Sequence, residues 1–420
     1  MKQKIPSEYV AAKLNDWYSA IRKNQVAASE ALKAEIMRDF EDMEENQDVL
    51  LYYSLLEFRH KLMLSYLKPK KSGNIEKNLR DLEEKEDQMT GLLNYYFWFF
   101  KGMYEFKKRE FVKAIGCYKM AEQKVNALED KVEKAEFYYK LAEIYYYINQ
   151  RYLSINYATM ASDIFQSYET LKEKKIYCDF IIAGNLVESM KYNDALTNLE
   201  HALEDAETVG NSHLTASAHF NLGNCYFYQK AYRQASEHME NALFIFEREK
   251  SSYVPKVLYN LMYVRLKQSR HAEAAECYEK GIKSAASLHD EEHEAKLNIL
   301  RGLYLDGGDR SAVQRGLDYL ESKRLYAAVE ELALDAAQYY NQIERLKDSI
   351  FYYEKSAQAR RKIQREMHCM KAKLLFVTLS LAAVLTSAGF LGEGHSARLY
   401  ADKMITNYGG PSAASVVQKA

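Results

Sequence analysis

Two histidines near residue 290 have the spacing of a zinc-binding pair. The run His289-Asp290-Glu291-Glu292-His293 matches the HxxEH pattern, in which histidines at i and i+4 share one helix face and can hold Zn²⁺. No third ligand is obvious, and such short motifs match often by chance. We therefore expect a solvated polar turn between two repeats here and predict no metal site.

Asparagines in the middle of the chain could hold a peptide backbone. Asn185, Asn221 and Asn224 fall on segments that the repeat pattern described below assigns to groove-lining helices. An Asn side chain offers both a donor and an acceptor, so it can bind an extended peptide whatever the peptide's sequence. Glu188 and Asp194 could pair with a basic side chain of that peptide. The alternative is an ordinary solvent-exposed polar surface.

An acidic run, EDMEENQD, spans residues 41–48. From the residues alone it is a charged loop between two helices. The sequence has no P-loop, GxGxxG, GxSxG or kinase motif, and no basic patch interleaved with aromatic residues. We therefore predict no cofactor bound by this chain and no nucleic-acid partner.

The composition favours a helical protein. The 420 residues include only 4 prolines and 17 glycines, whereas sheets joined by tight turns use more of both. Acidic and basic residues nearly cancel, with a net charge of -1, which gives no sign of a polyanion partner. The five cysteines are widely spaced and form no CxxC pair, so we expect buried free thiols in a reducing cytosol.

The N-terminal residues 1–70 are predicted to form a three-helix bundle. Apolar side chains recur at helical spacing in a first helix that Ser7 could cap, a second over residues 27–43, and a third from about Asp48 to Leu67. Pro69 ends the third helix. The polar residues 71–93 are predicted to be a linker or connecting helix.

Residues 94–366 repeat themselves. Tetratricopeptide units place a small residue on the first helix, a second small residue twelve positions later and a third seven after that, because the two helices cross closely there. In-phase triplets are Gly102/Ala114/Ala121, Ala142/Ser154/Ala161, Ala183/Ala195/Ala202 and Gly223/Ala235/Ala242, followed by weaker units at Met262, Gly302 and Ala337. The sequence thus predicts an all-α protein whose bundle is followed by a right-handed superhelix of about seven repeats, with first helices lining its concave face.

The tail from residue 370 to 420 has a different character. After a basic run comes an apolar stretch, 374–388, that is short for a membrane span but resembles the hydrophobic region of a secretory signal. We expect the body of the protein to be cytoplasmic, with the tail exported or inserted in a membrane. The alternative is a last capping helix with an apolar face.

Several segments together resemble the Rap family of peptide-regulated bacterial signalling proteins. They are LNDWYSAI, MEENQDVLLYYSLLEFRHKLMLSYL, YYFWFFKGMYEF, FIIAGNLVESMKYNDAL and the closing ARRKI, and the resemblance covers about residues 5–365. It implies a bundle that binds the receiver domain of a response regulator and a repeat domain that binds a Phr-type peptide. Family members either dephosphorylate such a regulator or sequester a transcription factor without chemistry.

The resemblance also assigns roles to residues of the bundle. Gln47 matches the catalytic glutamine of phosphatase members, with Glu45, Asn46, Asp48 and Phe58 as regulator contacts. The regulator holds the Mg²⁺, and a neutral amide can orient the attacking water, as the Gln of GTPases does. Peptide contacts by position are Asn185, Asp194 and Asn224.

The tail also resembles a Phr precursor fused in frame. Asp402 to Thr406 (DKMIT) resembles a mature signalling peptide, with fourteen residues after it. The segment could be exported and released, or it could occupy the groove of its own chain at ~mM effective concentration. The leading hypothesis is a peptide-regulated aspartyl-phosphate phosphatase, and the alternatives are a sequestering protein and a generic repeat adaptor.

Overall fold

The computed structural model describes residues 4–67, 73–125 and 128–387, with side chains described continuously as far as Glu366 from residue 128. Within these ranges the elements are helical, apart from one isolated β-bridge between Ile5 and Met43. The prediction of an all-α protein is confirmed. Packing divides the chain into two compact units. Unit 1 comprises residues 1–144 and 373–420, and unit 2 comprises residues 145–372.

The first three helices of unit 1 are α1 (Ser7–Arg22), α2 (Val26–Asp39) and α3 (Gln47–Leu67). Their facing sides bury the apolar stripe that the sequence predicted, including Val10, Leu14, Trp17, Ile21, Leu51, Leu55 and Leu62, all at 0–1% exposure. Helix α2 ends four residues earlier than predicted, because Met43 pairs with Ile5 instead of continuing the helix. Ser7 does not cap α1: Pro6 occupies that position, and the Ser7 hydroxyl accepts a hydrogen bond from Asn46.

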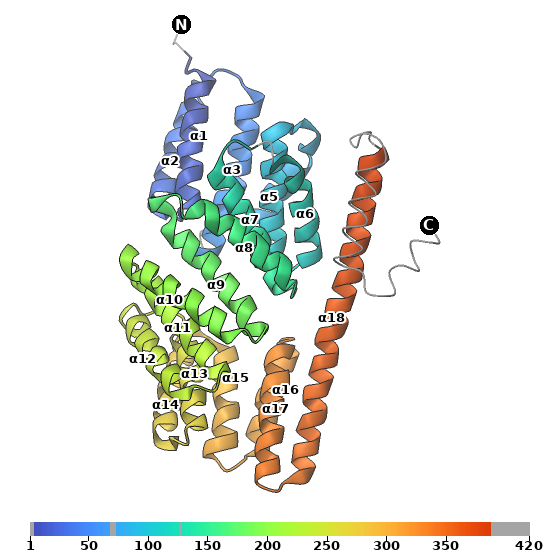
Figure 1. Cartoon of the computed structure of the whole chain (residues 1–420). Helices are drawn as coiled ribbons and strands as arrows, with labels where there is room; N and C mark the ends of the chain where they lie inside the picture. The colour runs from blue at the N-terminus through green and yellow to red at the C-terminus, as the bar shows by residue number, and fades with distance from the viewer. Residues whose placement is uncertain (1–3, 68–72, 126–127, 388–420) are drawn as a thin grey trace. The chain divides into compact units, whose positions relative to one another are not determined.

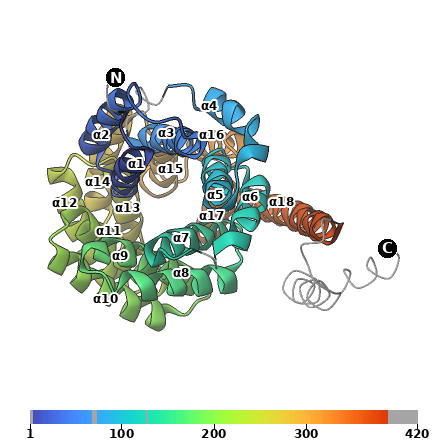
Figure 2. The same cartoon turned by 90° about the horizontal axis from the view of Figure 1, so that it is seen from above.

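Helix α3 lies between α1 and α5, as Figures 1 and 2 both show. The connecting segment contains a short helix, α4 (Ile75–Glu83), and a 3₁₀ turn, η2 (Glu86–Gln88), before α5 (Gly91–Lys107) and α6 (Phe111–Val125). Most of the aromatic run at residues 95–100 belongs to the core. Tyr95, Tyr96, Phe97, Phe99 and Phe100 are all buried, and their rings contact one another and Phe137 of α7 (Lys131–Tyr147).

A buried carboxylate ties the bundle to the first repeat helices within unit 1. Glu133 of α7 accepts hydrogen bonds from the hydroxyls of Tyr18 (2.9 Å) and Tyr95 (3.0 Å), and its Oε2 lies 3.2 Å from Arg22. Burial raises the pKa of Glu133, and the cation and the two phenols oppose that shift. Removing one partner of such a buried pair is costly, so this cluster fixes α1 against α5 and α7.

Seven antiparallel helix pairs follow one another from α5 to α18, as predicted (Figure 1). The helices that follow α7 are α8 (Arg151–Phe165), α9 (Lys172–Glu188), α10 (Tyr192–Val209), α11 (Ser212–Tyr228), α12 (Tyr232–Arg248), α13 (Val254–Lys267), α14 (His271–Leu288), α15 (Glu291–Leu300), α16 (Arg310–Ser322), α17 (Tyr326–Gln342) and α18 (Leu346–Ser387). A short 3₁₀ turn, η3 (Glu169–Leu171), precedes α9, and α15 continues into a π-helical turn, η4 (Arg301–Leu305).

The small residues of the repeats lie where the paired helices cross. A Cβ built on Gly102 would lie 2.5 Å from the buried ring of Tyr118, and one on Gly223 would lie 2.7 Å from Met239. These distances are shorter than any ordinary contact, so larger side chains would force the helices apart. The spacing rule that predicted the repeats therefore reflects the packing of α5 on α6 and of α11 on α12.

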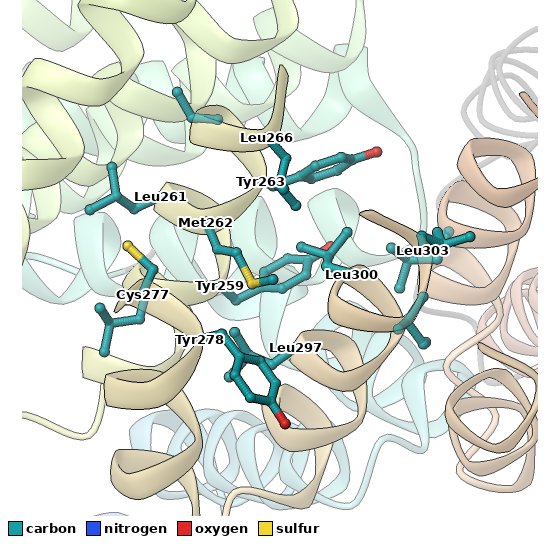
Figure 3. Packing of buried hydrophobic residues seen from close by; sticks show 14 of the residues in the cluster. Tyr259, Leu261, Met262, Tyr263, Leu266, Cys277, Tyr278, Leu297, Leu300 and Leu303 are labelled. Atoms are coloured by element: carbon teal, nitrogen blue, oxygen red, sulfur yellow. The ribbon is translucent and has the colours of Figure 1, made fainter. Parts of the chain in front are cut away.

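Besides two smaller clusters among α9, α10 and α11, the core of unit 2 contains one apolar cluster that extends from α11 to α18. Figure 3 shows its centre, where Met262, Leu297 and Leu300 pack between α13 and α15. The side chains of Tyr259 and Tyr263 point from α13 away from Leu261 and Cys277 (Figure 3). Four cysteines are buried free thiols, as predicted: Cys117, Cys178, Cys225 and Cys277.

The tail lies largely outside the described residues. Helix α18 continues to Ser387, but the side chains of the apolar stretch 374–388 and the whole of residues 388–420 are not described, and this includes Asp402 to Thr406. Among the helices that are described, none combines the length and the apolarity needed to cross a bilayer. Export of the tail stays a prediction.

Candidate functional site

Gln47 is the first residue of α3 and is exposed to solvent. Its amide makes one weak contact, since Nε2 donates over 3.3 Å to the carbonyl oxygen of the exposed Gln88 side chain. The first N–H groups of α3 are already capped by Asn46, so the group that Gln47 offers to a phosphoryl oxygen is its neutral side-chain amide.

The backbone before Gln47 is held by a short β-type contact. Ile5 donates its N–H to the carbonyl of Asp42 at 2.8 Å, and Glu44 donates to the carbonyl of Ile5 at 2.9 Å. Asn46 then starts the helix: its Oδ1 accepts from the N–H groups of Asp48 and Val49, and its Nδ2 donates to Ser7. Hydrogen bonds thus anchor the acidic loop at both ends.

The predicted regulator contacts fall into three groups in this structure. Glu45 and Asp48 are exposed beside Gln47 and are free to meet a partner. Asn46 is only half-buried, but its side chain is used to cap α3. The prediction for Phe58 does not fit the structure: its side chain is 1% exposed and packs in the core of unit 1, with its ring centroid 5.9 Å from that of Tyr104.

Leu50 is a surface residue that the sequence analysis missed. It lies one turn after Gln47 and is 39% exposed, whereas Leu51 beside it is buried. The signal was present in the sequence, because Leu50 falls outside the apolar stripe of Leu51, Leu55 and Leu62. Leu50 is thus an exposed apolar side chain on the same surface as Gln47.

A cavity of about 420 Å³ opens in unit 2 where α9 and α11 meet the end of α7. Its lining residues are Tyr146, Phe180, Ala183, Gly184, Val187, Glu188, Met190, Tyr192, Leu199, Asn221, Asn224 and Tyr228. The structure therefore brings together three of the predicted peptide-binding residues, Glu188, Asn221 and Asn224. The aromatic walls from Tyr146, Phe180 and Tyr228 were not predicted.

Asn185 does not belong to this cavity, contrary to the prediction. Its side chain is 0% exposed and faces α8, where Nδ2 donates to Ser154 Oγ at 2.9 Å and to the carbonyl of Ile181 at 2.8 Å. Its Oδ1 is buried without a hydrogen-bond partner. Asp194 is exposed in the first turn of α10, a second helix, and does not line the cavity either.

The cavity contains one carboxylate between neutral donors. Glu188 is half exposed, and its Oε2 lies 3.3 Å from Arg151 Nε on the rim. Burial, together with the nearby charge of Glu188, raises the pKa of the Tyr146 hydroxyl, and burial likewise raises that of Tyr228. Both phenols are therefore protonated at neutral pH. The cavity can accept a cation at Glu188 and can donate or accept hydrogen bonds at Asn221, Asn224 and the tyrosines.

The HxxEH run forms the polar turn that was expected. Asp290 caps α15, accepting from the backbone N–H of His293 at 3.1 Å, and its Oδ2 lies 2.7 Å from His293 Nδ1. His289 ends α14 in a left-handed conformation with φ 55°. Asp290 and His293 thus form the cap of α15. His289 has a left-handed backbone conformation and does not share a helix face with His293.

Two family models match the chain. The model described as "response regulator aspartate phosphatase H, N terminal" matches residues 4–65, which form the bundle, and a tetratricopeptide repeat model matches residues 181–248. Response regulator aspartate phosphatase I of Bacillus subtilis (strain 168) is 42% identical over 366 residues, covering 87% of this chain and 94% of that protein. Regulatory protein RapC of the same organism is 38% identical over 368 residues, covering 86% and 96%.

Solved structures show the same fold. The crystal structure of a Rap protein complexed with competence and sporulation factor has 41% sequence identity and a TM-score of 0.74, and the match covers 85% of this chain and 99% of that chain.

Proposed function

The chain belongs to the Rap family of response regulator aspartate phosphatases, and from this we propose that it hydrolyses the aspartyl-phosphate of a bacterial response regulator under the control of a bound peptide. The observation that supports the enzymatic part is the exposed Gln47 at the start of α3, inside the segment matched by the family's N-terminal model. The regulator and its Mg²⁺ come from outside this chain.

The chemistry assigned to Gln47 is the orientation of a water molecule. The water attacks phosphorus in line, the P–O bond to the aspartyl carboxylate breaks, and inorganic phosphate and a free carboxylate result. The amide oxygen of Gln47 accepts a hydrogen bond from the water and its NH₂ donates to a phosphoryl oxygen, as in GTPases. Glu45, Asp48 and Leu50 would contact the regulator's surface around its phosphorylated aspartate.

We expect Gln47→Ala to abolish most phosphatase activity while leaving regulator binding within about twofold. The reason is that the exposed amide contributes little to folding or to contact area. Phosphate release from a phosphorylated regulator measures the first effect, and calorimetry with the unphosphorylated regulator measures the second. Gln123→Ala, an exposed glutamine on α6, is the matched control. Full activity in Gln47→Ala would remove Gln47 from the mechanism.

The peptide-binding part of the proposal is supported by the cavity between α9 and α11. The side-chain amides of Asn221 and Asn224 can form hydrogen bonds with the backbone of a bound peptide. Phe180 and Tyr228 offer apolar contacts, and Glu188 can pair with a basic side chain of the peptide. The structure of a similar protein, the Rap conjugation gene regulator of the plasmid pLS20, has been solved in complex with the Phr* peptide. The segment Asp402 to Thr406, with its Lys403, is the peptide that we propose for this chain.

Sequestration of a transcription factor is the second candidate function. It is favoured by the 38% identity to a relative named as a regulatory protein and not as a phosphatase. The same bundle face could block a factor from DNA without any chemistry. A gel-shift assay and a phosphate-release assay separate the two. If sequestration is the activity, the Gln47→Ala variant would still remove the transcription factor from its DNA. The wild-type chain would then release no phosphate from a phosphorylated regulator.

A further inference from the structure

We propose that Lys256 and Lys296 form a carboxylate-binding subsite in unit 2 that receives the C-terminal carboxylate of the bound peptide. The proposal rests on the peptide binding proposed above and adds which end of the peptide the chain recognises. It also has a consequence for the fused tail, because a peptide embedded in a longer chain has no free carboxylate.

Lys256 is a partly buried cation whose charge is not compensated. It lies in the first turn of α13, with Nζ 4.9 Å from the ring centroid of Phe220 and 5.7 Å from that of Tyr253. Among the side chains that the structure describes, no carboxylate oxygen lies within 4.0 Å of this Nζ. Burial lowers the pKa of Lys256, and the neighbouring cation Lys296 lowers it further. Such a site gains free energy when an anion arrives.

Lys296 on α15 supplies a second ammonium group. Its Nζ lies 2.5 Å from Glu292 Oε1 and 5.7 Å from the ring centroid of Tyr259. Glu292 and Lys296 are also the two charges that act on Lys256, and they have opposite sign. Lys296 is thus already paired with Glu292, whereas Lys256 has no carboxylate oxygen within 4.0 Å among the described side chains and can take one monovalent anion.

The subsite shares helix α11 with the proposed peptide cavity. Phe220, which contacts Lys256, directly precedes the cavity residue Asn221 on α11, and Asn224 lies one turn further along. We infer that a peptide held by the two asparagines places one end against Lys256. The aromatic rings of Phe220, Tyr253 and Tyr259 surround the ammonium groups and give an apolar wall for the last side chain of the peptide.

A terminal carboxylate fits this site better than the other anions a peptide could offer. It carries one charge, which matches the one uncompensated lysine, whereas a phosphate group would bring nearly two. Glu188 lies on α9 across the cavity and suits a basic residue nearer the peptide's beginning. The segment Asp402 to Thr406 has this polarity, with Lys403 near its start and Thr406 at its end.

The uncleaved tail lacks the terminal carboxylate that this subsite binds. Fourteen residues, 407–420, follow Thr406, so the segment has a peptide bond there instead of a carboxylate. If the subsite binds the terminal carboxylate, the tail must be cleaved after Thr406 before it can inhibit. The subsite therefore favours release of the peptide over occupation of the groove by the intact chain.

Two synthetic peptides test the proposal: Asp402–Thr406 as the free acid and as the C-terminal amide. On the wild-type full-length chain, we expect the amide to bind roughly 10- to 100-fold more weakly, because a charge-assisted hydrogen bond is lost. On Lys256→Met the two peptides should bind within about threefold of each other, and Lys256→Arg should restore part of the preference. Lys280→Met, an exposed lysine on α14, is the control.

The comparison of the two peptides on the wild-type chain does not depend on any variant folding. Equal affinity of the acid and the amide there would overturn the subsite while leaving peptide regulation intact. An unchanged preference in Lys256→Met would overturn the role of Lys256. Binding of neither peptide to the wild-type chain would count against the peptide proposed for this protein and would overturn the inference with it.

Discussion

Asn185 and Asn224 show how strongly the position within a repeat decides the role of a side chain. Both lie on first helices, but Asn185 is two residues after the small residue Ala183, and Asn224 is one residue after Gly223. The equivalent of Asn185 in the next repeat is Cys225, which is also 0% exposed. The equivalent of Asn224 in the previous repeat is Gly184, which also lines the cavity. Counting from the small residue would thus have predicted which asparagine is buried.

The two asparagines should respond differently to truncation. We expect Asn185→Ala to lower the free energy of unfolding by about 1–3 kcal/mol, because its hydrogen bond to Ser154 is buried, and to change peptide affinity little. Asn224→Ala should weaken peptide binding roughly tenfold with little effect on stability. Thermal unfolding and binding of the Asp402–Thr406 peptide, measured on both variants, give the comparison. A large affinity loss in Asn185→Ala would mean that the side chain turns into the cavity when peptide binds.

The helices of the bundle show which element boundaries follow from local sequence. Helix α3 begins and ends within one residue of its prediction, because its apolar stripe and the following Pro69 are local signals. Helix α2 ends early because Met43 pairs with Ile5, which lies 38 residues before it in the sequence. Phe58 is a different case, because it lies on the same apolar stripe as Leu55 and Leu62 and its burial follows from local spacing. The resemblance assigned it to the regulator surface, whereas the end of α2 is decided by a contact between distant segments.

His60 on α3 joins the three bundle helices. Its ring lies 3.2 Å from Ser29 Oγ of α2 and stands edge-on to Trp17 of α1 at 5.5 Å. Burial lowers the pKa of His60 from 6.5 to about 4. The unfolded chain therefore binds this proton first as the pH falls, so the stability due to the neutral ring is complete above about pH 6.5 and is lost progressively toward pH 4.

We expect the free energy of unfolding of unit 1 to fall by about 2 kcal/mol between pH 7.5 and pH 5 from this residue. Urea unfolding followed by tryptophan fluorescence measures it selectively, because the two tryptophans, Trp17 and Trp98, both lie in unit 1. His60→Gln should reduce the pH dependence by that amount, whereas His201→Gln, on the surface of α10, should not. The same pH dependence in wild type and His60→Gln would show that other groups cause it.

At the scale of the whole molecule, the repeat pattern predicted seven helix pairs but not how the chain divides into compact units. The sequence suggested a boundary near residues 71–93, where the composition becomes polar. In the structure, unit 1 extends to Ile144, because Tyr18 and Arg22 of α1 bind Glu133 of α7. A polar linker was visible in the sequence. A buried ion pair between residues 111 positions apart was not.

Under the proposed function, the tail makes the control of activity a property of the whole chain. A chain shortened to end at Thr406 carries the proposed peptide with a free carboxylate, whereas the full chain carries the same residues without one. Tethering gives a segment an effective concentration of ~mM where the linker can span the sites. We therefore expect the chain ending at Thr406 to dephosphorylate a response regulator at least tenfold more slowly than the full chain. Lys256→Met in the shortened chain should restore activity.

A chain ending at Gly410 is the matched control for this prediction, because it differs from the shortened chain by only four residues and again lacks a carboxylate at Thr406. It should be as active as the full chain. Equal inhibition of the chains ending at Thr406 and Gly410 would mean that the segment is bound through its interior, and the intact tail would then inhibit without cleavage. Equal activity of all three chains would instead mean that the peptide acts only after release, since tethering prevents its entry.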